Sequence, residues 1–181
     1  MGLAERHLPH YTVKDYMRWE GDWELIEGIP FAMAPSPLGI HQAVAMEIGR
    51  QIANQLEDCK HPCFVYPELD WVISEDTVVR PDLIVICKKI KEFVRETPEV
   101  VIEVVSSSTA RKDEHLKFEL YQRERVPTYI MVYPEFKKVR VFALKDNSFT
   151  KIFDSDEGKL EVELKNGCGF LIDINKLWSA M

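Results

Sequence analysis

The chain lacks any uninterrupted apolar run of about 18 residues, the length that a membrane-spanning helix requires. Its first residues, MGLAERHLPHYTVKDY, also lack the apolar centre of a secretory signal peptide. They begin Met-Gly, but Arg6 stands where a myristoylation signal requires Ser or Thr. These absences predict a cytoplasmic protein with no membrane partner.

Cysteine is scarce, with four residues in the chain. Cys59 and Cys63 enclose His61 in the stretch CKHPC, which could supply part of a metal site. The spacing is not that of a CxxC pair, and the sequence shows no second cluster that would complete four zinc ligands. We therefore expect Cys59, Cys63, Cys87 and Cys168 to be unrelated thiols in a reducing compartment.

Positive charge is also scarce, since 23 Lys and Arg residues stand against 30 Asp and Glu residues, for a net charge of −7. A protein that coats nucleic acid without specificity would be basic, because its contacts are with phosphates. The acidic balance disfavours that class. It is compatible with an enzyme that acts on nucleic acid. A metal-dependent site itself contributes carboxylates, and basic residues can gather in a local patch.

Repeats and low-complexity segments are absent as well, and 181 residues suffice for one sizeable core but are short for two. We expect a single domain over residues 1–181, with PSPLG as a loop. Capping residues and apolar periodicity predict helices over residues 12–19, 40–58 and 113–125, with a last helical turn at 174–181. Predicted strands lie within residues 22–34, which turn at Glu27-Gly28, and at 63–66, 69–73, 79–87, 100–105, 128–133, 138–144, 148–153 and 160–164. This order predicts an α/β (α+β) fold with a central mixed β-sheet, flanking helices and extra β-hairpins.

Two carboxylates stand in segments that otherwise suit burial. Five of the six residues from Val100 to Val105 are Val or Ile, and the sixth is Glu103. Asp82 opens the apolar run of RPDLIVIC in a similar way. An ionised carboxylate inside a protein is costly unless a basic partner, a raised pKa or a metal ion compensates it. If the two strands are neighbours, both acids can point into one cleft, where carboxylates, water and a backbone carbonyl form a shell suited to Mg²⁺ or Mn²⁺.

Lys117 lies about one turn into the helix that follows the second of these strands. From there its ammonium could reach back over the strand end, hold a water for attack and offset charge on a phosphate. A metal, two carboxylates and a lysine are the components of phosphodiester hydrolysis. A purely structural interpretation competes with this one. In it, Asp82 caps a strand or pairs with Arg80, and Glu103 pairs with Lys117 or Arg111.

At these residues the sequence resembles a known superfamily. RPDLIVIC followed by PEVVIEVVSSSTARKDEHLKFELYQRERVPTYIMVYPE is similar to the PD-(D/E)XK nucleases, and more narrowly to the Uma-type family of restriction-endonuclease-like proteins, a former domain of unknown function. The stretches WELIEGIPFAMAPSPLGIHQAVAMEIGRQI, KVRVFAL and INKLW also fit, so the resemblance covers nearly the whole chain. It implies a restriction-endonuclease-like core.

One departure concerns the catalytic lysine. The superfamily motif places Lys two residues after the second acid, where this chain has Val105. In the Uma-type family this lysine is thought to have moved to the following helix, where Lys117 matches it. The resemblance therefore implies Lys117 as the displaced catalytic lysine. It also implies Asp82 and Glu103 as ligands of Mg²⁺ or Mn²⁺, with the Val105 carbonyl as a further ligand.

Other candidates come from the same resemblance. Glu24 and His41 match recurrent family positions, and His41 at a helix start could act as a general base or contact a phosphate. The alternative for His41 is a helix-terminus histidine without a role. Glu47 ranks below Glu24, because nothing around it marks a site. Asp70 is expected to be structural, and Tyr121 to pack its helix.

Two sets of basic residues could contact DNA, although both also suit a solvated surface. They are Lys88, Lys89, Lys91 and Arg95, and Arg111 with Lys112. The exposed aromatic pairs of a single-strand stacking platform are not evident.

Three functions compete for this sequence. The leading hypothesis is a Mg²⁺-dependent endonuclease that hydrolyses DNA phosphodiester bonds, with a homodimer suggested by related nucleases that pair to cut two strands. The second is a catalytically inactive interaction or dimerisation module, motivated by the acidic charge and by Val105. The third is a two-carboxylate glycosidase. The lysine between the acids and the lack of a groove rich in Trp and Tyr argue against it.

Overall fold

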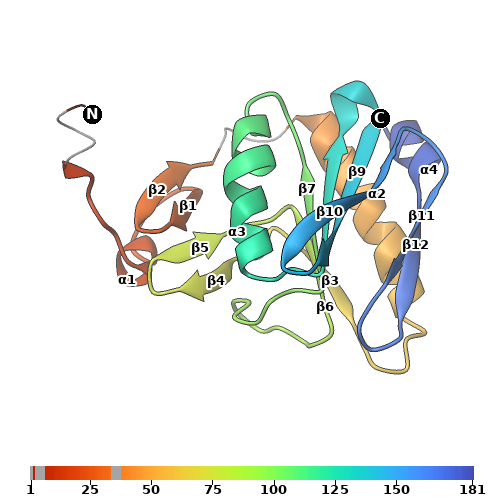
Figure 1. The fold of residues 1–181 in the computed structure, drawn as a ribbon, viewed down its shortest axis with the longest axis horizontal. Helices are drawn as coiled ribbons and strands as arrows, with labels where there is room; N and C mark the ends of the chain where they lie inside the picture. The colour runs from red at the N-terminus through yellow and green to blue at the C-terminus, as the bar shows by residue number, and fades with distance from the viewer. Residues whose placement is uncertain (1, 3–6, 34–37) are drawn as a thin grey trace.

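A computed structural model describes residues 2, 7–33 and 38–181 (Figure 1). Residues 35–37 of the predicted PSPLG loop therefore lie outside the described residues. The helices are α1 (Val13–Tyr16), α2 (Gly39–Leu56), α3 (Lys117–Arg123) and α4 (Ile174–Ser179), with a π-helical turn η2 (Lys112–Leu116) and a 3-10 turn η3 (Pro134–Phe136). The strands are β1 (Trp23–Ile26), β2 (Ile29–Ala32), β3 (Phe64–Pro67), β4 (Trp71–Ser74), β5 (Thr77–Val79), β6 (Leu83–Ile86), β7 (Val100–Val104), β8 (Thr128–Tyr133), β9 (Lys138–Lys145), β10 (Ser148–Ser155), β11 (Lys159–Glu163) and β12 (Gly169–Asp173).

The described strands form three sheets. The largest has six strands in the order β10-β9-β8-β7-β6-β3, and only the pair β7 and β8 is parallel. The connection between these two strands carries η2 and α3, as a parallel crossover requires. A four-stranded sheet has the order β2-β1-β5-β4, and β11 pairs with β12 as a hairpin. The mixed central sheet, the flanking helices and the extra hairpins confirm the predicted fold class.

The two faces of the six-stranded sheet are covered by different elements. Side chains alternate along a strand, so Val100, Ile102 and Val104 join the core shared with α2, α4 and the β11–β12 hairpin. Val101 and Val105 join the core beneath α3. Figure 1 shows α3 and the four-stranded sheet on one side of the large sheet, and α2 with the hairpin on the other. Glu103 is two residues from both Val101 and Val105, so it points to the same face of the sheet, toward α3.

The strand predicted at residues 79–87 is wrong as a single element. It is divided into β5 and β6, which belong to different sheets. Pro81 separates them, because proline has no N–H for a sheet ladder and disfavours a continuous central strand. Asp82 therefore stands at the junction of the two sheets, directly before β6.

Three other elements differ from the predictions. The predicted helix from Asp113 begins instead as the π-helical turn η2 and continues as α3. Strand β12 was not predicted, because Gly169 and the short alternation after it give little periodicity. The first helix is shorter than expected, although its capping box between Thr12 and Asp15 is present.

No helix among the described residues has the length and apolar character needed to cross a membrane.

The four cysteines are paired, which corrects the expectation of unrelated thiols. Cys59 bonds to Cys168, and Cys63 bonds to Cys87. The partners are 109 and 24 residues apart in the chain, so their spacing could not reveal the pairing. They meet because β3 pairs with β6 and because the β11–β12 hairpin packs against α2.

Candidate functional site

The predicted acids meet at one end of the six-stranded sheet. The antiparallel register of β6 and β7 pairs Leu83 with Ile102, so the preceding residue Asp82 arrives beside Glu103. The Asp82 backbone N–H lies 3.4 Å from Glu103 Oε2. Both acids line a cavity of about 350 Å³ at this sheet end. The neighbouring strands therefore bring the two carboxylates together.

Glu103 is held in a fixed position within this site, with 3% of its surface exposed. Its Oε1 accepts hydrogen bonds from Lys117 Nζ at 2.8 Å and from the Tyr121 hydroxyl at 2.7 Å. Burial raises the pKa of Glu103 well above its ordinary value, and the charge of Lys117 opposes this rise. The nearby carboxylates of Asp113 and Asp82 add to the rise. A further cation in the cavity would relieve this accumulation of negative charge.

Asp82 is bound by the strand beside it and by α2. Its Oδ2 accepts a 2.6 Å hydrogen bond from the Val104 backbone N–H and lies 3.4 Å from His41 Nε2. Among the described residues no group bonds to Asp82 Oδ1. Burial lowers the pKa of His41, but the hydrogen bond and charge of Asp82 outweigh it and leave a net rise. His41 Nδ1 is buried and has no partner in the part of the chain that the structure describes.

Lys117 lies at the centre of the carboxylates, and its side chain is 3% exposed. Its Nζ is 2.8 Å from both Glu24 Oε1 and Glu103 Oε1, and 3.8 Å from Asp113 Oδ1. Burial alone would lower the pKa of Lys117, but Glu103, Glu24 and Asp113 raise it well above its ordinary value. The ammonium therefore stays charged. The π-helical turn η2 carries Asp113 and leads directly into Lys117, and such turns are frequent at functional sites.

Glu24 forms an ion pair with Lys117 but does not line the cavity. It comes from β1 and is fully buried. Its carboxylate accepts bonds from the Arg80 backbone N–H at 2.9 Å and from Lys112 Nζ at 2.6 Å, besides the contact with Lys117. Burial alone would raise the pKa of Glu24, but the two lysines bring it below its ordinary value. The four-stranded sheet thus contributes one charged group to the site.

Two residues of the site had no functional role in the sequence prediction. Asp113, expected only as a helix cap, is 3% exposed and lines the cavity. Burial raises its pKa, although Lys117 opposes this. Tyr121, expected to pack its helix, also donates to Glu103. The one available signal was spacing, because Asp113 and Tyr121 flank Lys117 at four residues on either side and share its helix face.

Other acidic candidates lie outside the cavity. Asp70 Oδ1 accepts a 2.7 Å bond from Arg80 Nε, and Asp70 Oδ2 accepts a 2.9 Å bond from the Tyr16 hydroxyl, a structural arrangement as expected. Arg80 also binds Asp22, so the structural interpretation in which Arg80 pairs with Asp82 is wrong. Glu47 pairs with Arg50 along α2 and does not line the cavity.

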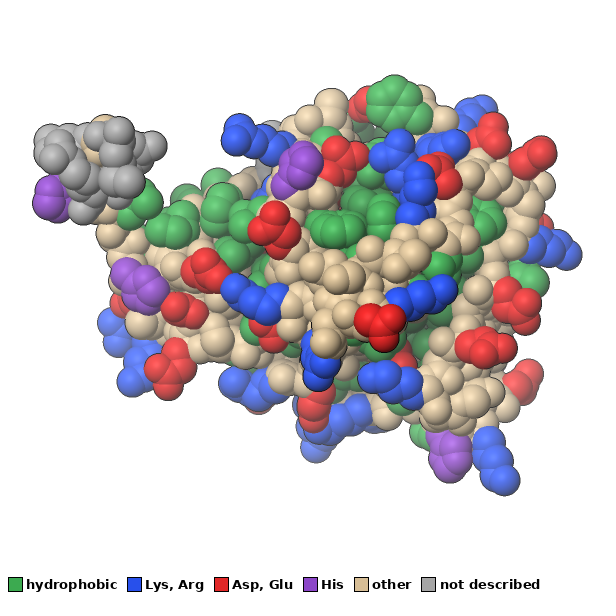
Figure 2. Space-filling view, viewed as in Figure 1, with side chains coloured by type: hydrophobic (Ala, Val, Ile, Leu, Met, Phe, Trp, Pro, Cys, Tyr) green, Lys and Arg blue, Asp and Glu red, His purple; other side chains and the backbone are tan. Residues whose placement is uncertain are grey.

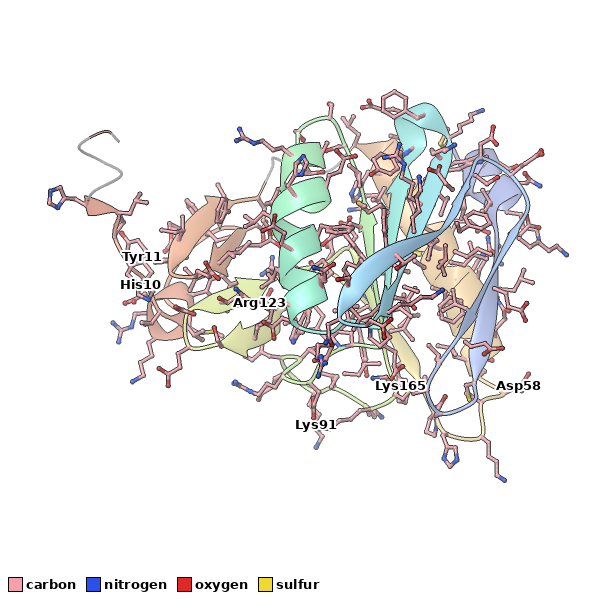
Figure 3. All side chains as sticks on the ribbon, viewed as in Figure 1. His10, Tyr11, Asp58, Lys91, Arg123 and Lys165 are labelled. Atoms are coloured by element: carbon pink, nitrogen blue, oxygen red, sulfur yellow. A yellow bond between two sulfur atoms is a disulfide. The ribbon has the colours of Figure 1, made fainter. Side chains whose placement is uncertain are left out.

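The predicted DNA-contacting residues divide between the two ends of the sheet. Lys88, Lys89, Lys91 and Arg95 follow β6, at the end opposite Asp82. Lys88 pairs there with Glu96, and Lys91 projects from the molecule below the sheets in Figure 3. Lys112 instead reaches the site and lines the cavity, while Arg111 is exposed. The face drawn in Figure 2 carries interspersed basic and acidic side chains rather than one basic area.

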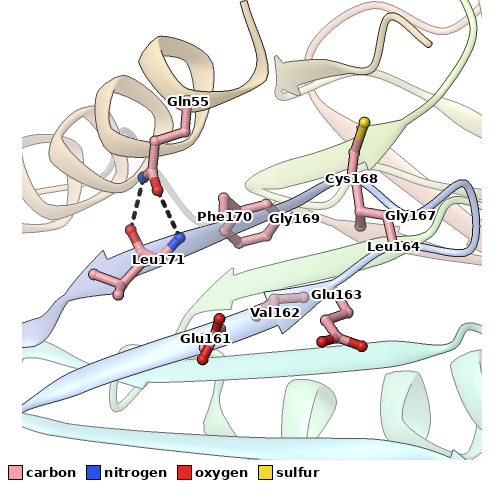
Figure 4. Close-up of a pocket in the computed structure, with 10 residues that line it drawn as sticks. All are labelled: Gln55, Glu161, Val162, Glu163, Leu164, Gly167, Cys168, Gly169, Phe170 and Leu171. Carbon is pink, nitrogen blue, oxygen red and sulfur yellow. Dashed lines mark hydrogen bonds between the residues drawn. The ribbon is translucent and has the colours of Figure 1, made fainter. Parts of the chain in front are cut away.

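A second cavity, of about 450 Å³, lies between α2 and the turn of the β11–β12 hairpin (Figure 4). The Gln55 side chain donates to the Leu171 carbonyl and accepts from the Leu171 N–H, both at 2.8 Å. None of the predicted site residues lines this cavity. It carries no catalytic set and is not a candidate for the chemistry implied by the acids.

The donor set of the first cavity fits a magnesium-like ion. Within the described residues, no group of three or more His, Cys, Asp or Glu side chains is arranged to hold a metal. Mg²⁺ does not need such a cage, because it keeps several waters and binds through one or two carboxylates together with substrate phosphates. Asp82 Oδ1 has no partner among the described residues, and Glu103 Oε2 has only the long contact with the Asp82 N–H. These two oxygens are available as hard ligands.

A mixed sheet that brings two acids from adjacent strands together, with a lysine bonded to one of them, is consistent with the restriction-endonuclease-like class of the PD-(D/E)XK superfamily. The chain belongs to the Uma2 family, described as "Putative restriction endonuclease", whose model matches residues 13–168. A solved structure, a "putative nuclease belonging to DUF820" from Anabaena variabilis ATCC 29413, is similar with a TM-score of 0.75 and 17% identity, over 94% of this chain and 98% of that chain. At this identity the likeness establishes the fold. No curated protein matches the sequence significantly.

Proposed function

We propose that this protein is a Mg²⁺-dependent endonuclease that hydrolyses DNA phosphodiester bonds. The proposal depends above all on one observation: Asp82, Glu103 and Lys117 line the same cavity. The family description supports a nuclease, and the choice of Mg²⁺, or Mn²⁺ in its place, follows from the oxygen ligands. A cytoplasmic location and a homodimer stay predictions, and sedimentation equilibrium would test the latter.

Asp82 and Glu103 would hold the ion, with the Val105 carbonyl as the further ligand. When bound, the ion supplies Lewis-acid polarisation of the phosphate and a more acidic bound water. Lys117 has three N–H donors, and Glu24 and Glu103 take two of them at 2.8 Å. The third can bind a water or a phosphate oxygen in the cavity. The ammonium also offsets negative charge that develops during hydrolysis.

His41 approaches the same site from the first turn of α2. Its contact with Asp82 orients the imidazole, and its position suits a general base or a phosphate contact. Glu24 acts at one remove, as a positioning residue that keeps Lys117 charged and directed at Glu103. Asp82, Glu103, Lys117 and His41 thus line the cavity, whereas Glu24 holds Lys117 in position.

Cleavage of supercoiled plasmid and of single-stranded DNA tests the proposal. We expect metal-dependent cleavage by the native chain and a loss of more than about 100-fold in Glu103→Gln. Glu161→Gln, an equivalent change on the exposed side of β11, is the matched control and should cut normally. Equal cleavage by native protein and Glu103→Gln would assign the activity to a contaminant. An uncut substrate, with no metal binding by calorimetry, would reject the proposal.

One observation favours an inactive interaction module as a second candidate. Lys117 already pairs with Glu24 and Glu103, so the buried charges are compensated without a metal. In that case divalent ions bind no better to the folded chain than to the unfolded chain, and they do not raise its Tm. A Mn²⁺-dependent rise in Tm that Asp82→Asn abolishes would decide for the nuclease.

A further inference from the structure

The four cysteines gather at the end of the molecule opposite the acidic cavity. They come from four places in the chain: Cys59 follows α2, Cys63 precedes β3, Cys87 follows β6, and Cys168 precedes β12. The sulfurs of Cys63 and Cys168 lie 3.5 and 3.9 Å from one atom, the His61 carbonyl oxygen. The two sulfur pairs are therefore immediate neighbours. At the extended spacing of a strand, Cys87 is roughly 17 Å from Asp82.

A side-chain amide lies beside the sulfurs and can donate to them. The Asn166 Nδ2 group lies 3.0 Å from Cys63 Sγ, 3.5 Å from Cys87 Sγ and 3.2 Å from the His61 carbonyl oxygen. Asn166 Oδ1 accepts from the Cys168 N–H at 3.0 Å, which fixes the turn that carries this cysteine. Gly167 completes the turn with a φ of +82°. Such an N–H donor would stabilise thiolates that bind a metal, because outer-shell hydrogen bonds orient and tune metal ligands.

A lysine stands close in sequence to three of the cysteines, although Asp58 directly precedes Cys59. Lys60 follows Cys59, Lys88 follows Cys87, and Lys165 precedes Cys168 by three residues. Figure 3 shows Lys165 and the acidic Asp58 toward this end of the molecule. Neighbouring cations lower the pKa of a thiol and favour the thiolate, which is the form that binds metal. They also offset the double negative charge of four thiolates around one divalent ion.

We propose that the four cysteines, when reduced, form a structural tetrathiolate Zn²⁺ site that fastens the β11–β12 hairpin and the α2–β3 loop to the edge of the central sheet. Four sulfur ligands in a closed tetrahedron are characteristic of structural zinc. In the disulfide state the sulfurs bond to each other and are not open donors. The site is independent of the acidic cavity and of the proposed nuclease.

The exchange between the two states balances with a dithiol reductant. Each of two dithiols gives two electrons and two protons to one protein disulfide, breaks its S–S bond and is itself oxidised to a disulfide. The four thiols formed then lose four protons as one Zn²⁺ binds. The hairpin is cross-linked in both states, by the Cys59–Cys168 bond in the first and through Cys168 and the shared Zn²⁺ in the second.

The test uses the full chain purified without chelator under anaerobic, reducing conditions. We expect one zinc per chain by elemental analysis, release of that zinc when a mercurial blocks the thiols, and a Kd of about 50 nM or tighter for re-added Zn²⁺. Co²⁺ in place of zinc should give thiolate charge-transfer absorption and the visible bands of tetrahedral coordination. Cys168→Ser should lose the metal.

Two variants separate this site from its neighbours. His61→Ala should keep zinc, because His61 presents its carbonyl oxygen to the sulfurs. Glu103→Gln should keep it as well, because the acids lie at the other end of the sheet. Native protein that carries no zinc and gives no Co²⁺ thiolate bands overturns the proposal, even if Cys168→Ser fails to fold. Disulfides that resist a dithiol in the folded chain, or the absorption of an iron–sulfur cluster, overturn it as well.

Discussion

Lys117 Nζ lies 2.8 Å from Glu103 Oε1, although the two residues are 14 positions apart in the chain. Val105, the position at which the superfamily motif has lysine, shares the face of Glu103 and is buried in the core beneath α3. A lysine from α3 therefore reaches the acid from above the sheet instead of from the strand itself. Lys117 thus contacts the carboxylate that the proposed chemistry uses.

Replacement of Lys117 by Met should strongly destabilise the fold. It leaves two buried acids, Glu24 and Glu103, without their shared partner, and breaking such a pair costs about 3–5 kcal/mol. Lys112→Met is the matched control, since that side chain is 19% exposed and its loss leaves Glu24 paired with Lys117. We expect a clearly smaller loss of stability than in Lys117→Met, because Glu24 keeps its second partner. Urea denaturation measures both, and equal losses would contradict the central place assigned to Lys117.

Glu24→Gln should slow turnover without weakening metal binding. Gln keeps the shape and can still accept the Arg80 N–H, but it removes the charge that directs Lys117. Because Glu24 does not line the cavity, we expect a fall in kcat of about 10- to 100-fold at an unchanged Mn²⁺ concentration for half-maximal activity. Glu47→Gln, a change on α2 outside the site, is the control. A shift in the Mn²⁺ requirement would instead make Glu24 part of the metal site.

The meeting of the two central acids could be predicted from the apolar runs that contain them. An acid within a Val and Ile strand is costly without compensation, so Glu103 stood out in the sequence. The alternation of side chains then fixed the face to which it points. Asp82 followed from the start of the adjacent apolar run. These inferences needed only that β6 and β7 be neighbours, and the structure confirms this.

Other features depend on contacts that no local pattern encodes. Glu24 meets Lys117 across 93 positions of the sequence only because the four-stranded sheet packs beside α3. The division of residues 79–87 between two sheets depends on where β5 finds its partners. The π-helical turn before Lys117 was missed as well, because its extra residue per turn is invisible to an ordinary helical period.

Asp113→Asn should raise the metal requirement of cleavage. Asp113 lines the cavity beside Asp82 and Glu103 and contributes negative charge there. Its amide replacement keeps the size and the capacity for hydrogen bonding but removes the charge. We expect the Mn²⁺ concentration for half-maximal cleavage to rise about 10- to 100-fold. Glu119→Gln, an exposed acid on the following helix α3, is the control, and identical metal titrations of both variants would exclude Asp113 from the site.

The β9–β10 hairpin should lose stability in acid because of Asp154. Hydrogen bonds from Lys151 and Lys138 lower the pKa of Asp154 to about 2. A carboxyl whose folded pKa lies below its unfolded value of about 3.9 stabilises the fold above that value. This contribution is lost as the pH falls from about 4 to about 2. Asp154→Asn should therefore lower the Tm at pH 7 but not at pH 2, whereas the exposed Asp156→Asn should lower it at neither.

Replacement of His41 distinguishes a catalytic group from a helix-terminus histidine. If the imidazole serves as a base or phosphate contact, His41→Ala should reduce cleavage by about 100-fold or more. His41→Gln, which can still donate to Asp82, should keep the metal affinity of the native chain while turnover stays low. Added imidazole should restore part of the activity of His41→Ala, because the small ring can occupy the vacated space beside Asp82. A structural role would give the opposite pattern: a lower Tm in both variants, normal cleavage by the folded fraction, and no response to imidazole.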